Sequence, residues 1–196
     1  MTDQHKGNPI VSPASASEWE QWLDRNHTTS AGVWLKIPKK GVAPPPAAPT
    51  YAEALEAALC FGWIDGQKAA LDDSAWLQRF TRRGPRSKWS RINREHATRL
   101  IDEGRMRPAG LEQVELARGD GRWEAAYEPQ STATVPDDLA AELERSPAAA
   151  AFFATLNSVN RYAILYRIGD AKRSETRARR IQKFVEMLEQ GKKLYP

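Results

Sequence analysis

The chain has 196 residues, 41% of them hydrophobic and 28% charged, with a formal net charge of +4 and a mean hydropathy of −0.64. This balance is typical of a soluble globular protein and excludes a disordered chain, and no stretch approaches the roughly 20 consecutive apolar residues of a membrane-spanning helix. The single cysteine, Cys60, excludes an internal disulfide, and three scattered histidines lack the spacing of a structural zinc site, so we expect neither metal nor cofactor.

The chain begins with a segment, residues 1–13, that we expect to be a disordered tail. This segment has no apolar core of the kind that a signal peptide requires, so we expect a cytoplasmic protein. Proline blocks helix interiors, so the Pro-rich runs Gly41–Pro49 and Glu128–Pro136 are predicted to be loops or linkers. The second run is the best candidate for a domain boundary.

Residues 14–128 are predicted to form an α+β core with a small antiparallel sheet. Thr50 and Glu53 form a capping-box pattern, in which each side chain binds a backbone N–H of the other, and this pattern predicts the start of a helix. Apolar spacing and alternation give the other elements. In chain order these are a helix from Ser17 to before Thr28, a strand over Gly32–Lys39, a helix over Tyr51–Phe61, strands over Trp63–Ala70 and Ala75–Thr81, and helices over Arg91–Glu103 and from Pro108 to before Gly119.

Residues 136–196 are predicted to form a helical module. Asp137 and Asp138 follow Pro136 and complement the dipole of a first helix. Three further helices are expected over Ser146–Leu156, Ser158–Ile168 and Ser174–Gln190, where serines stand at the starts. The whole chain is therefore predicted to be a helix-rich α+β protein.

Positive charge is concentrated in two segments, although the whole chain is only weakly basic. Residues 79–107 contain ten Arg or Lys and three acids, and residues 161–193 contain ten and four. Such asymmetry favours an anionic partner, although acidic surfaces elsewhere in the fold could neutralise it.

The most informative segment is Arg79–Arg91, which contains no acidic residue. Guanidinium groups bind phosphate or carboxylate oxygens in a forked geometry, and the N-terminus of the following helix also favours an anion. The alternative is a solvated or internally paired face, because Arg91, Glu95, Arg99 and Glu103 are each four residues apart.

Catalytic signatures such as a Walker loop, a G-x-S-x-G elbow or H-E-x-x-H are missing from the sequence. Asp65 lies between large apolar residues and could be a buried catalytic or binding carboxylate. The alternatives are that it accepts backbone N–H groups in a turn or pairs with an arginine. His96 is interpreted as a packed or surface residue, with acid–base catalysis as the alternative, and Cys60 as a small buried residue rather than a nucleophile. An enzyme is therefore the less favoured expectation.

Several runs of the sequence resemble one known family. The runs EALCFGWIDGQ, RFTRRGPRSKWSRIN and VPDDLAAELERSPAAAAFFATL are similar to the YdeI/OmpD-associated (bacteriocin-protection) family, and the likeness extends from about Trp19 to Lys193. The resemblance implies a helix-rich α+β fold, a C-terminal helical module and a link to stress or antimicrobial-peptide resistance, but no reaction. The family usually has Pro where this chain has Arg82, so we expect a more basic and more flexible loop here.

Three functional hypotheses follow, and none of them fixes the oligomeric state. The first is a non-enzymatic binder of a small anionic or phosphate-bearing ligand, held between the FGWID turn and the Arg-rich loop. The second is nucleic-acid binding through residues 79–107 and 161–193. The third is a hydrolase or transferase that uses Asp65 with Asn93 or His96. In the first hypothesis, the arginines predicted to bind the anion are Arg79, Arg83 and Arg86, and the predicted hydrogen-bonding residues are Ser87, Ser90 and Asn93. Trp63 and Trp89 are predicted to form walls of the site, and Asp65 is predicted to orient an arginine or the ligand.

Overall fold

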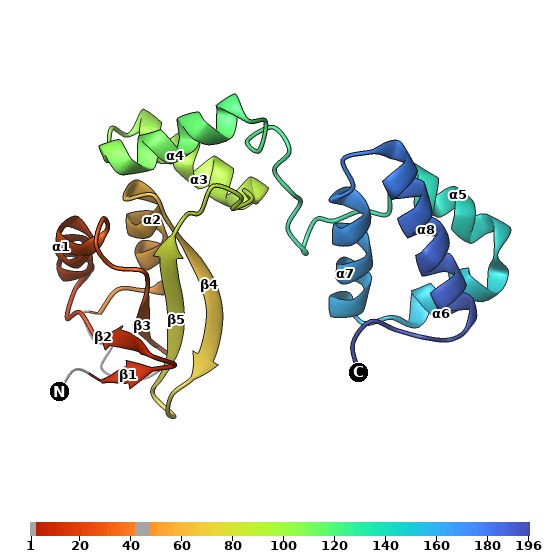
Figure 1. Cartoon of the computed structure of the whole chain (residues 1–196). Coiled ribbons are helices and arrows are strands. Elements are labelled where there is room, and N and C mark those ends of the chain that lie inside the picture. The colour runs from red at the N-terminus through yellow and green to blue at the C-terminus, as the bar shows by residue number, and fades with distance from the viewer. Residues whose placement is uncertain (1–2, 42–47) are drawn as a thin grey trace. The chain divides into compact units, whose positions relative to one another are not determined.

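The computed structural model describes residues 3–41 and 48–196, so part of the predicted loop Gly41–Pro49 lies outside the described residues. The chain divides into two compact units, which we describe separately: residues up to Trp89 with Asn93–Ala125, and Ser90–Ile92 with Ala126–Pro196. In order, the elements are β1 (Gln4–His5), β2 (Asn8–Val11), α1 (Ala16–Asn26), β3 (Val33–Pro38), α2 (Tyr51–Cys60), β4 (Trp63–Ala70), β5 (Ala75–Arg82), α3 (Arg91–Asp102), α4 (Pro108–Gly119), α5 (Asp137–Arg145), α6 (Pro147–Thr155), α7 (Ser158–Gly169) and α8 (Ser174–Glu189) (Figure 1). The predicted helix-rich α+β class is confirmed.

Within the described ranges, the first unit contains a five-stranded sheet in the order β1-β2-β3-β5-β4. The three predicted strands pair antiparallel as expected, but β2 pairs parallel with β3, so the sheet is mixed and not purely antiparallel. The prediction of a disordered N-terminal tail is wrong for residues 4–11. Pro9 and Gly7 hide the strand pattern in the sequence, whereas Ile10 and Val11 pair with Trp34 and Leu35 on the neighbouring strand.

One face of the sheet is covered by α1 and α2. Alternate residues of β5 point to the same face, and two of them meet these helices: Phe80 contacts Trp19 of α1, and Trp76 contacts Tyr51 of α2. Trp19 is completely buried, and its indole N–H donates to the carbonyl of Ala54 at 3.1 Å. This bond satisfies the indole and joins the two helices over the sheet.

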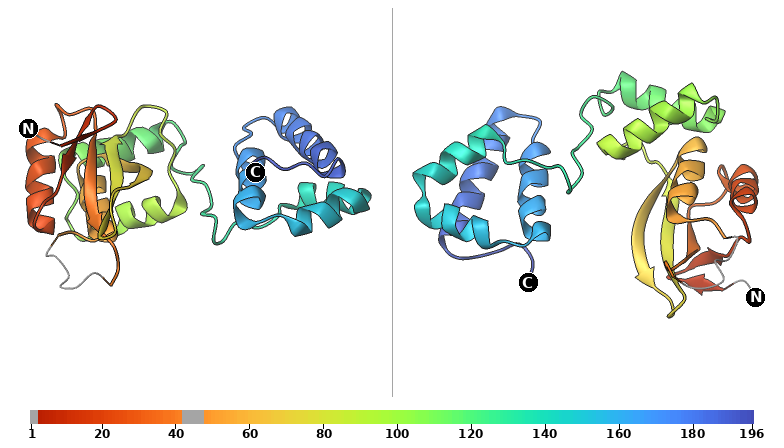
Figure 2. Two further views of the ribbon diagram at one scale, coloured as in Figure 1. Left: turned by 90° about the horizontal axis from the view of Figure 1, so that it is seen from below. Right: turned by 180° about the vertical axis from the view of Figure 1, so that it is seen from behind.

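The turn between α2 and β4 packs directly on α4. Gly62 has a φ of +72°, and a Cβ there would lie 2.7 Å from the carbonyl oxygen of Ala109. At the opposite side of this contact, a Cβ on Gly110 would lie 2.3 Å from the carbonyl oxygen of Cys60. Both glycines are therefore required for the close approach, which holds α4 beyond the end of the sheet where β4 begins (Figures 1 and 2).

The second unit contains α5, α6, α7 and α8. Its core is formed by Leu, Ile, Phe and Ala side chains from all four helices, including the fully buried Leu139, Ile164 and Leu188. Asp138 in the first turn of α5 forms an ion pair with Arg177 of α8, which lowers the pKa of Asp138 below its ordinary value. Apolar packing with a polar bond at the rim therefore holds the predicted helical module together.

Candidate functional site

Arg83, one of the three arginines predicted to bind the anion, is a buried residue that packs against Trp89. Its guanidinium carbon lies 3.5 Å from the centroid of the Trp89 ring, and Nη1 donates to the carbonyl of Lys88 at 3.2 Å. Its backbone N–H also donates to Gly62 at 3.0 Å, which fixes the loop to the α2–β4 turn. The side chain is 6% exposed, so this cation stabilises the fold of the loop.

Arg79 and Arg86, the other two arginines predicted to bind the anion, and their neighbour Arg82 have different surroundings. Arg79 lies over the Trp34 ring and donates to Asn8 Oδ1 at 3.3 Å. Arg82 donates to the carbonyl of Thr28 at 2.9 Å, whereas Arg86 is exposed. Protein carbonyl and amide oxygens therefore already accept from two of these arginines.

The two predicted tryptophan walls lie inside the protein. Trp63 is fully buried, and its indole donates to the carbonyl of His27 at 3.1 Å. Trp89 is 1% exposed and contacts Trp123 edge to face with centroids 4.9 Å apart. Asp65 accepts a hydrogen bond of 2.8 Å from the Tyr51 hydroxyl, and within the described residues its carboxylate is bonded to no arginine and no backbone amide.

The predicted hydrogen-bonding residues also serve the local structure. The Ser87 hydroxyl accepts from the N–H of Gly84 at 3.0 Å and closes the loop. Ser90 belongs to the second unit, where it forms a β-bridge with Tyr127, and Asn93 is buried in the first unit. Each of these contacts serves the local structure, and the role of the predicted residues in ligand binding stays a prediction.

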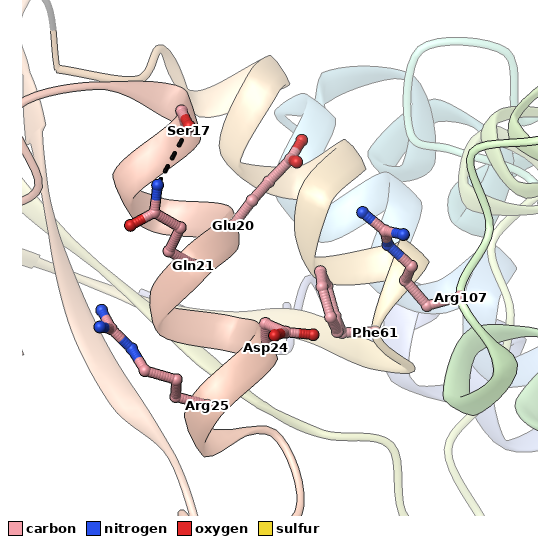
Figure 3. A pocket seen from close by; sticks show the side chains of 7 residues that line it. All are labelled: Ser17, Glu20, Gln21, Asp24, Arg25, Phe61 and Arg107. Carbon is pink, nitrogen blue, oxygen red and sulfur yellow. Dashed lines mark hydrogen bonds between the residues drawn. The ribbon is translucent and has the colours of Figure 1, made fainter.

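A pocket of about 370 Å³ lies elsewhere in the first unit, between α1 and the start of α4 (Figure 3). Phe61 forms an apolar wall, and the side chains around it carry both signs of charge. The lining residues are Ser17, Glu20, Gln21, Asp24, Arg25, Phe61 and Arg107.

Local structure explains how these charges reach one pocket. Glu20 and Asp24 are four residues apart on α1, so they lie on one face of the helix, away from the buried Trp19 and Leu23. Arg107 is the N-cap residue of α4, and its backbone N–H donates to the carbonyl of Cys60 at 3.1 Å. The tight contact between α2 and α4 therefore places this guanidinium opposite the two carboxylates.

The pocket charges have few internal partners. In the part of the chain that the structure describes, the side chains of Glu20, Asp24 and Arg25 form no hydrogen bond or ion pair. Within the same part of the chain, the Arg107 guanidinium makes only a cation–π contact with Phe61 at 5.8 Å. Figure 3 shows the Arg107 guanidinium and the two carboxylates around the Phe61 ring. Charged groups in this arrangement are available to a ligand.

Cys60, next to the pocket wall, is held as a thiol. Burial raises its pKa to about 11, and the opposing influence of Arg105 and Arg107 does not compensate. A thiol with this pKa is almost entirely protonated at neutral pH, and only a thiolate is an effective nucleophile. The structure therefore gives the cysteine a packing position without an activated sulfur.

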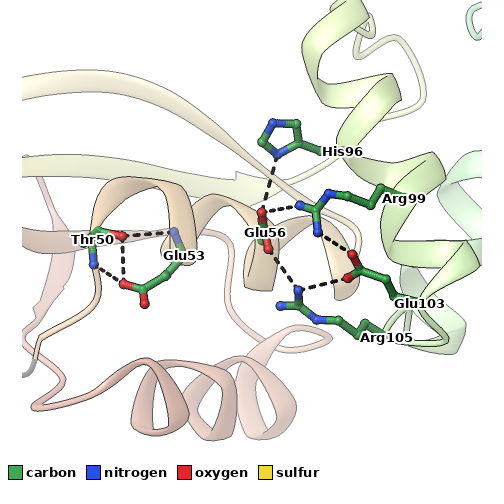
Figure 4. A network of polar contacts seen from close by, with 7 residues as sticks. All are labelled: Thr50, Glu53, Glu56, His96, Arg99, Glu103 and Arg105. Atoms are coloured by element: carbon green, nitrogen blue, oxygen red, sulfur yellow. Dashed lines mark hydrogen bonds and ion pairs between the residues drawn. The ribbon is translucent and has the colours of Figure 1, made fainter.

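A second polar cluster joins α2 to α3 (Figure 4). Glu56 accepts from Arg99 and, at 3.0 Å, from Arg105, and both arginines also pair with Glu103. His96 Nδ1 lies 4.0 Å from the Glu56 carboxylate. Arg99 and Arg105, which are among the ten basic residues in residues 79–107, therefore pair with the chain's own carboxylates.

Sequence reasoning missed Glu20, Asp24 and Arg107. The spacing of the two acids on an amphipathic helix was a usable signal, but nothing local connects Arg107 with them. Over residues 3–41 and 48–196, no group of three or more His, Cys, Asp or Glu side chains is arranged to hold a metal ion. In the same residues, no helix has the length and apolar character needed to cross a bilayer.

Two family models match the chain. Residues 11–113 match a family described as a domain of unknown function (DUF8412), and residues 132–191 match the family described as bacteriocin-protection, YdeI or OmpD-associated (OmdA). Comparisons with curated proteins and with solved structures gave no significant match. The second match confirms the resemblance over the helical module, while the first describes a family that carries no functional name.

Proposed function

We propose that this chain, which belongs to the DUF8412 family and carries a YdeI/OmpD-associated (OmdA) helical module, is a non-enzymatic binding protein for a small zwitterionic ligand. The observation that carries the proposal is the pocket in which Glu20, Asp24 and Arg107 surround Phe61 with no ion pair between described side chains to neutralise them. Its volume of about 370 Å³ lies within the range of small-molecule sites.

The charges of the pocket favour a ligand with both signs. Glu20 and Asp24 would accept hydrogen bonds from an ammonium group, and Arg107 would donate a forked pair to a carboxylate. A purely anionic ligand such as phosphate would be repelled by the two carboxylates on the α1 side. Phe61 is only 4% exposed and contributes little apolar surface, so the two charged groups of the ligand supply most of the match, as in an α-amino acid or the end of a peptide.

This proposal modifies the hypothesis drawn from the sequence. An anionic group remains part of the ligand, and the FGWID turn remains part of the site through Phe61, but the cation that binds the anion is Arg107. The site predicted at Arg79–Asn93 stays a prediction, for which exposed Arg86 is the residue to test.

Nucleic-acid binding through the two basic segments has weaker support. Arg99 and Arg105 pair with acids in the first unit, and Arg177 pairs with Asp138 in the second. Phosphate contacts would make log K fall with log salt at about −0.9 per neutralised phosphate on duplex DNA. A salt titration with duplex DNA therefore separates this alternative from the small-ligand proposal.

The proposal is tested by isothermal titration calorimetry with L-leucine, N-acetyl-L-leucine and L-leucinamide as probes. We expect L-leucine to bind at least tenfold more tightly than either blocked form, since each lacks one of the two charges, and tenfold corresponds to about 1.4 kcal/mol. Asp24→Asn and Arg107→Gln should each lower the affinity for L-leucine at least tenfold. Asp73→Asn and Arg118→Gln are matched controls, because both residues are charged and exposed but lie outside the pocket.

Two results would contradict the proposal. One is equal binding of L-leucine and its two blocked forms, and the other is native affinity in both Asp24→Asn and Arg107→Gln. Tighter binding of inorganic phosphate than of L-leucine would restore the anion hypothesis, and loss of phosphate binding in Arg86→Ala would locate it at the predicted loop.

A further inference from the structure

The second unit contains a pocket of its own, with a volume of about 390 Å³. It lies where α6 passes into α7, beside the segment that follows α8. Phe152 and Leu156 supply apolar wall and are partly buried against the helical core. The full lining consists of Phe152, Thr155, Leu156, Asn157, Asn160, Gly191 and Lys193.

The segment Lys193–Tyr195 is fixed to α7 by a buried amide. Asn160 is 1% exposed, and its Oδ1 accepts from the backbone N–H of Tyr195 at 2.9 Å. Its Nδ2 donates to the carbonyl of the same residue at 3.3 Å, and Arg167 donates to the Tyr195 hydroxyl at 3.1 Å. These three bonds keep the segment at the pocket and position Lys193 at its edge.

The wall opposite the α6–α7 junction is formed by backbone. Gly191 follows the C-cap of α8 with a φ of +64°, a conformation that L side chains rarely adopt. A Cβ at this position would lie 3.9 Å from Cε2 of Phe152, at van der Waals contact distance. Glycine therefore terminates the helix and leaves the Phe152 ring accessible from this side.

The pocket has a single sign of charge. Lys193 is the one charged residue in its lining, and among the described residues no carboxylate pairs with its ammonium group. The neighbouring Lys192 instead donates to Gln190 Oε1 at 2.8 Å. Asn157 lines the pocket and uses its Oδ1 to accept from Asn160, and within the described residues its side-chain N–H groups donate to no other residue.

We propose that this pocket is a second ligand site, which binds a small monoanion with an apolar body, such as an aryl or short alkyl carboxylate. The carboxylate would pair with Lys193 and accept from Asn157, while the apolar body would contact Phe152 and Leu156. The proposal is independent of the zwitterion site, because it concerns a different unit and a lining without any acid. Apolar walls with a few convergent polar groups are the usual composition of a small-molecule site.

The test is a ¹H–¹⁵N correlation NMR titration of the full chain with 3-phenylpropionate and with its neutral amide. We expect saturable shifts of the Asn157 and Gly191 amides, with the carboxylate binding at least tenfold more tightly than the amide. Lys193→Gln should lower the affinity for 3-phenylpropionate at least tenfold, whereas the adjacent Lys192→Gln should leave that affinity unchanged. Both substitutions are on exposed side chains, so the dispersed spectrum of the folded chain serves as the control for structure.

Three results would overturn the proposal. The first is equal affinity for the carboxylate and the amide, and the second is unchanged affinity in Lys193→Gln. The third is a set of shifts confined to Phe61 and Arg107, which would assign the probe to the first unit. Since Asp24→Asn alters only the first pocket, it should leave binding of 3-phenylpropionate unchanged and so distinguishes failure of this proposal from failure of the proposed function.

Discussion

Substitution of Gly110 by alanine tests the contact that positions Arg107. In an ordinary helix this change stabilises, because alanine has a helix propensity about 1 kcal/mol better than glycine. Here the new Cβ would lie 2.3 Å from the carbonyl oxygen of Cys60 and 2.8 Å from that of Leu59. Since both neighbours are backbone atoms, α4 must retreat by about 0.7 Å merely to reach 3.0 Å, the lower limit for real Cβ contacts.

The cost of such overpacking is typically about 1–3 kcal/mol. Because both contacts are with backbone atoms, we expect a cost in the upper part of this range, about 2–3 kcal/mol. After subtraction of the propensity gain of about 1 kcal/mol, Gly110→Ala should be destabilised by about 1–2 kcal/mol. Gly119→Ala is the matched control in the same helix, because nothing lies within 4 Å of its Cβ position, and it should be neutral or stabilised by about 0.5 kcal/mol.

The assay is guanidinium unfolding followed by tryptophan fluorescence. All seven tryptophans belong to the first unit, so this signal reports its unfolding without interference from the second. The midpoint should fall for Gly110→Ala and stay or rise for Gly119→Ala. A native or higher midpoint in Gly110→Ala would refute the close contact between α2 and α4, and with it the stated reason for the position of Arg107.

Three further predictions concern single groups. Arg83→Ala should destabilise the first unit by about 2–4 kcal/mol, because it removes a buried cation–π contact and hydrogen bond, and an unchanged unfolding midpoint would contradict this packing role. Hydrogen bonds from Ser74 lower the pKa of exposed Asp72 to about 2 from an ordinary 3.8, so the contribution of the Asp72 carboxylate to stability is complete above about pH 4 and is lost as the pH falls toward 2. Asp72→Asn should remove that part of the pH dependence of unfolding. A pH profile of stability identical to that of the unaltered chain would exclude this contribution. Because burial raises the pKa of Cys60 to about 11, iodoacetamide at pH 7.5 should modify the folded chain far more slowly than the unfolded chain, and equal rates would show that the thiol is accessible.

Much of the fold is visible in the sequence because it depends on local patterns. The capping box is present in the structure, with the Thr50 side chain accepting from Glu53 N–H and the Glu53 carboxylate accepting from Thr50 N–H. The strands around Leu71–Ser74 and the four helices after Pro136 likewise follow from alternation and from N-terminal signals. The first two strands were missed because each is short and one contains Pro9, so β2 depends on its pairing with β3, and β1 depends on its pairing with β2.

The candidate site was less predictable because the partners of charged side chains are not local. Arg83 and Arg82 donate to backbone carbonyls, which every residue has and no sequence pattern marks. An acid-free run of arginines therefore indicates local positive charge, but it does not show whether the guanidinium groups bind oxygen atoms of the protein or of a ligand. The sequence also failed to indicate the pocket that contains Glu20 and Arg107. These residues are distant in the sequence and line one pocket only because α4 packs on the turn at Gly62.

An isotope-filtered NOE experiment on the full chain with L-leucine tests most directly whether the ligand binds in the pocket at Phe61 and Arg107. The account predicts intermolecular NOEs between the methyl groups of L-leucine and the ring protons of Phe61, together with their loss in Arg107→Gln. NOEs to the side chains around Arg86, or saturable binding of L-leucine without any NOE to Phe61, would contradict it.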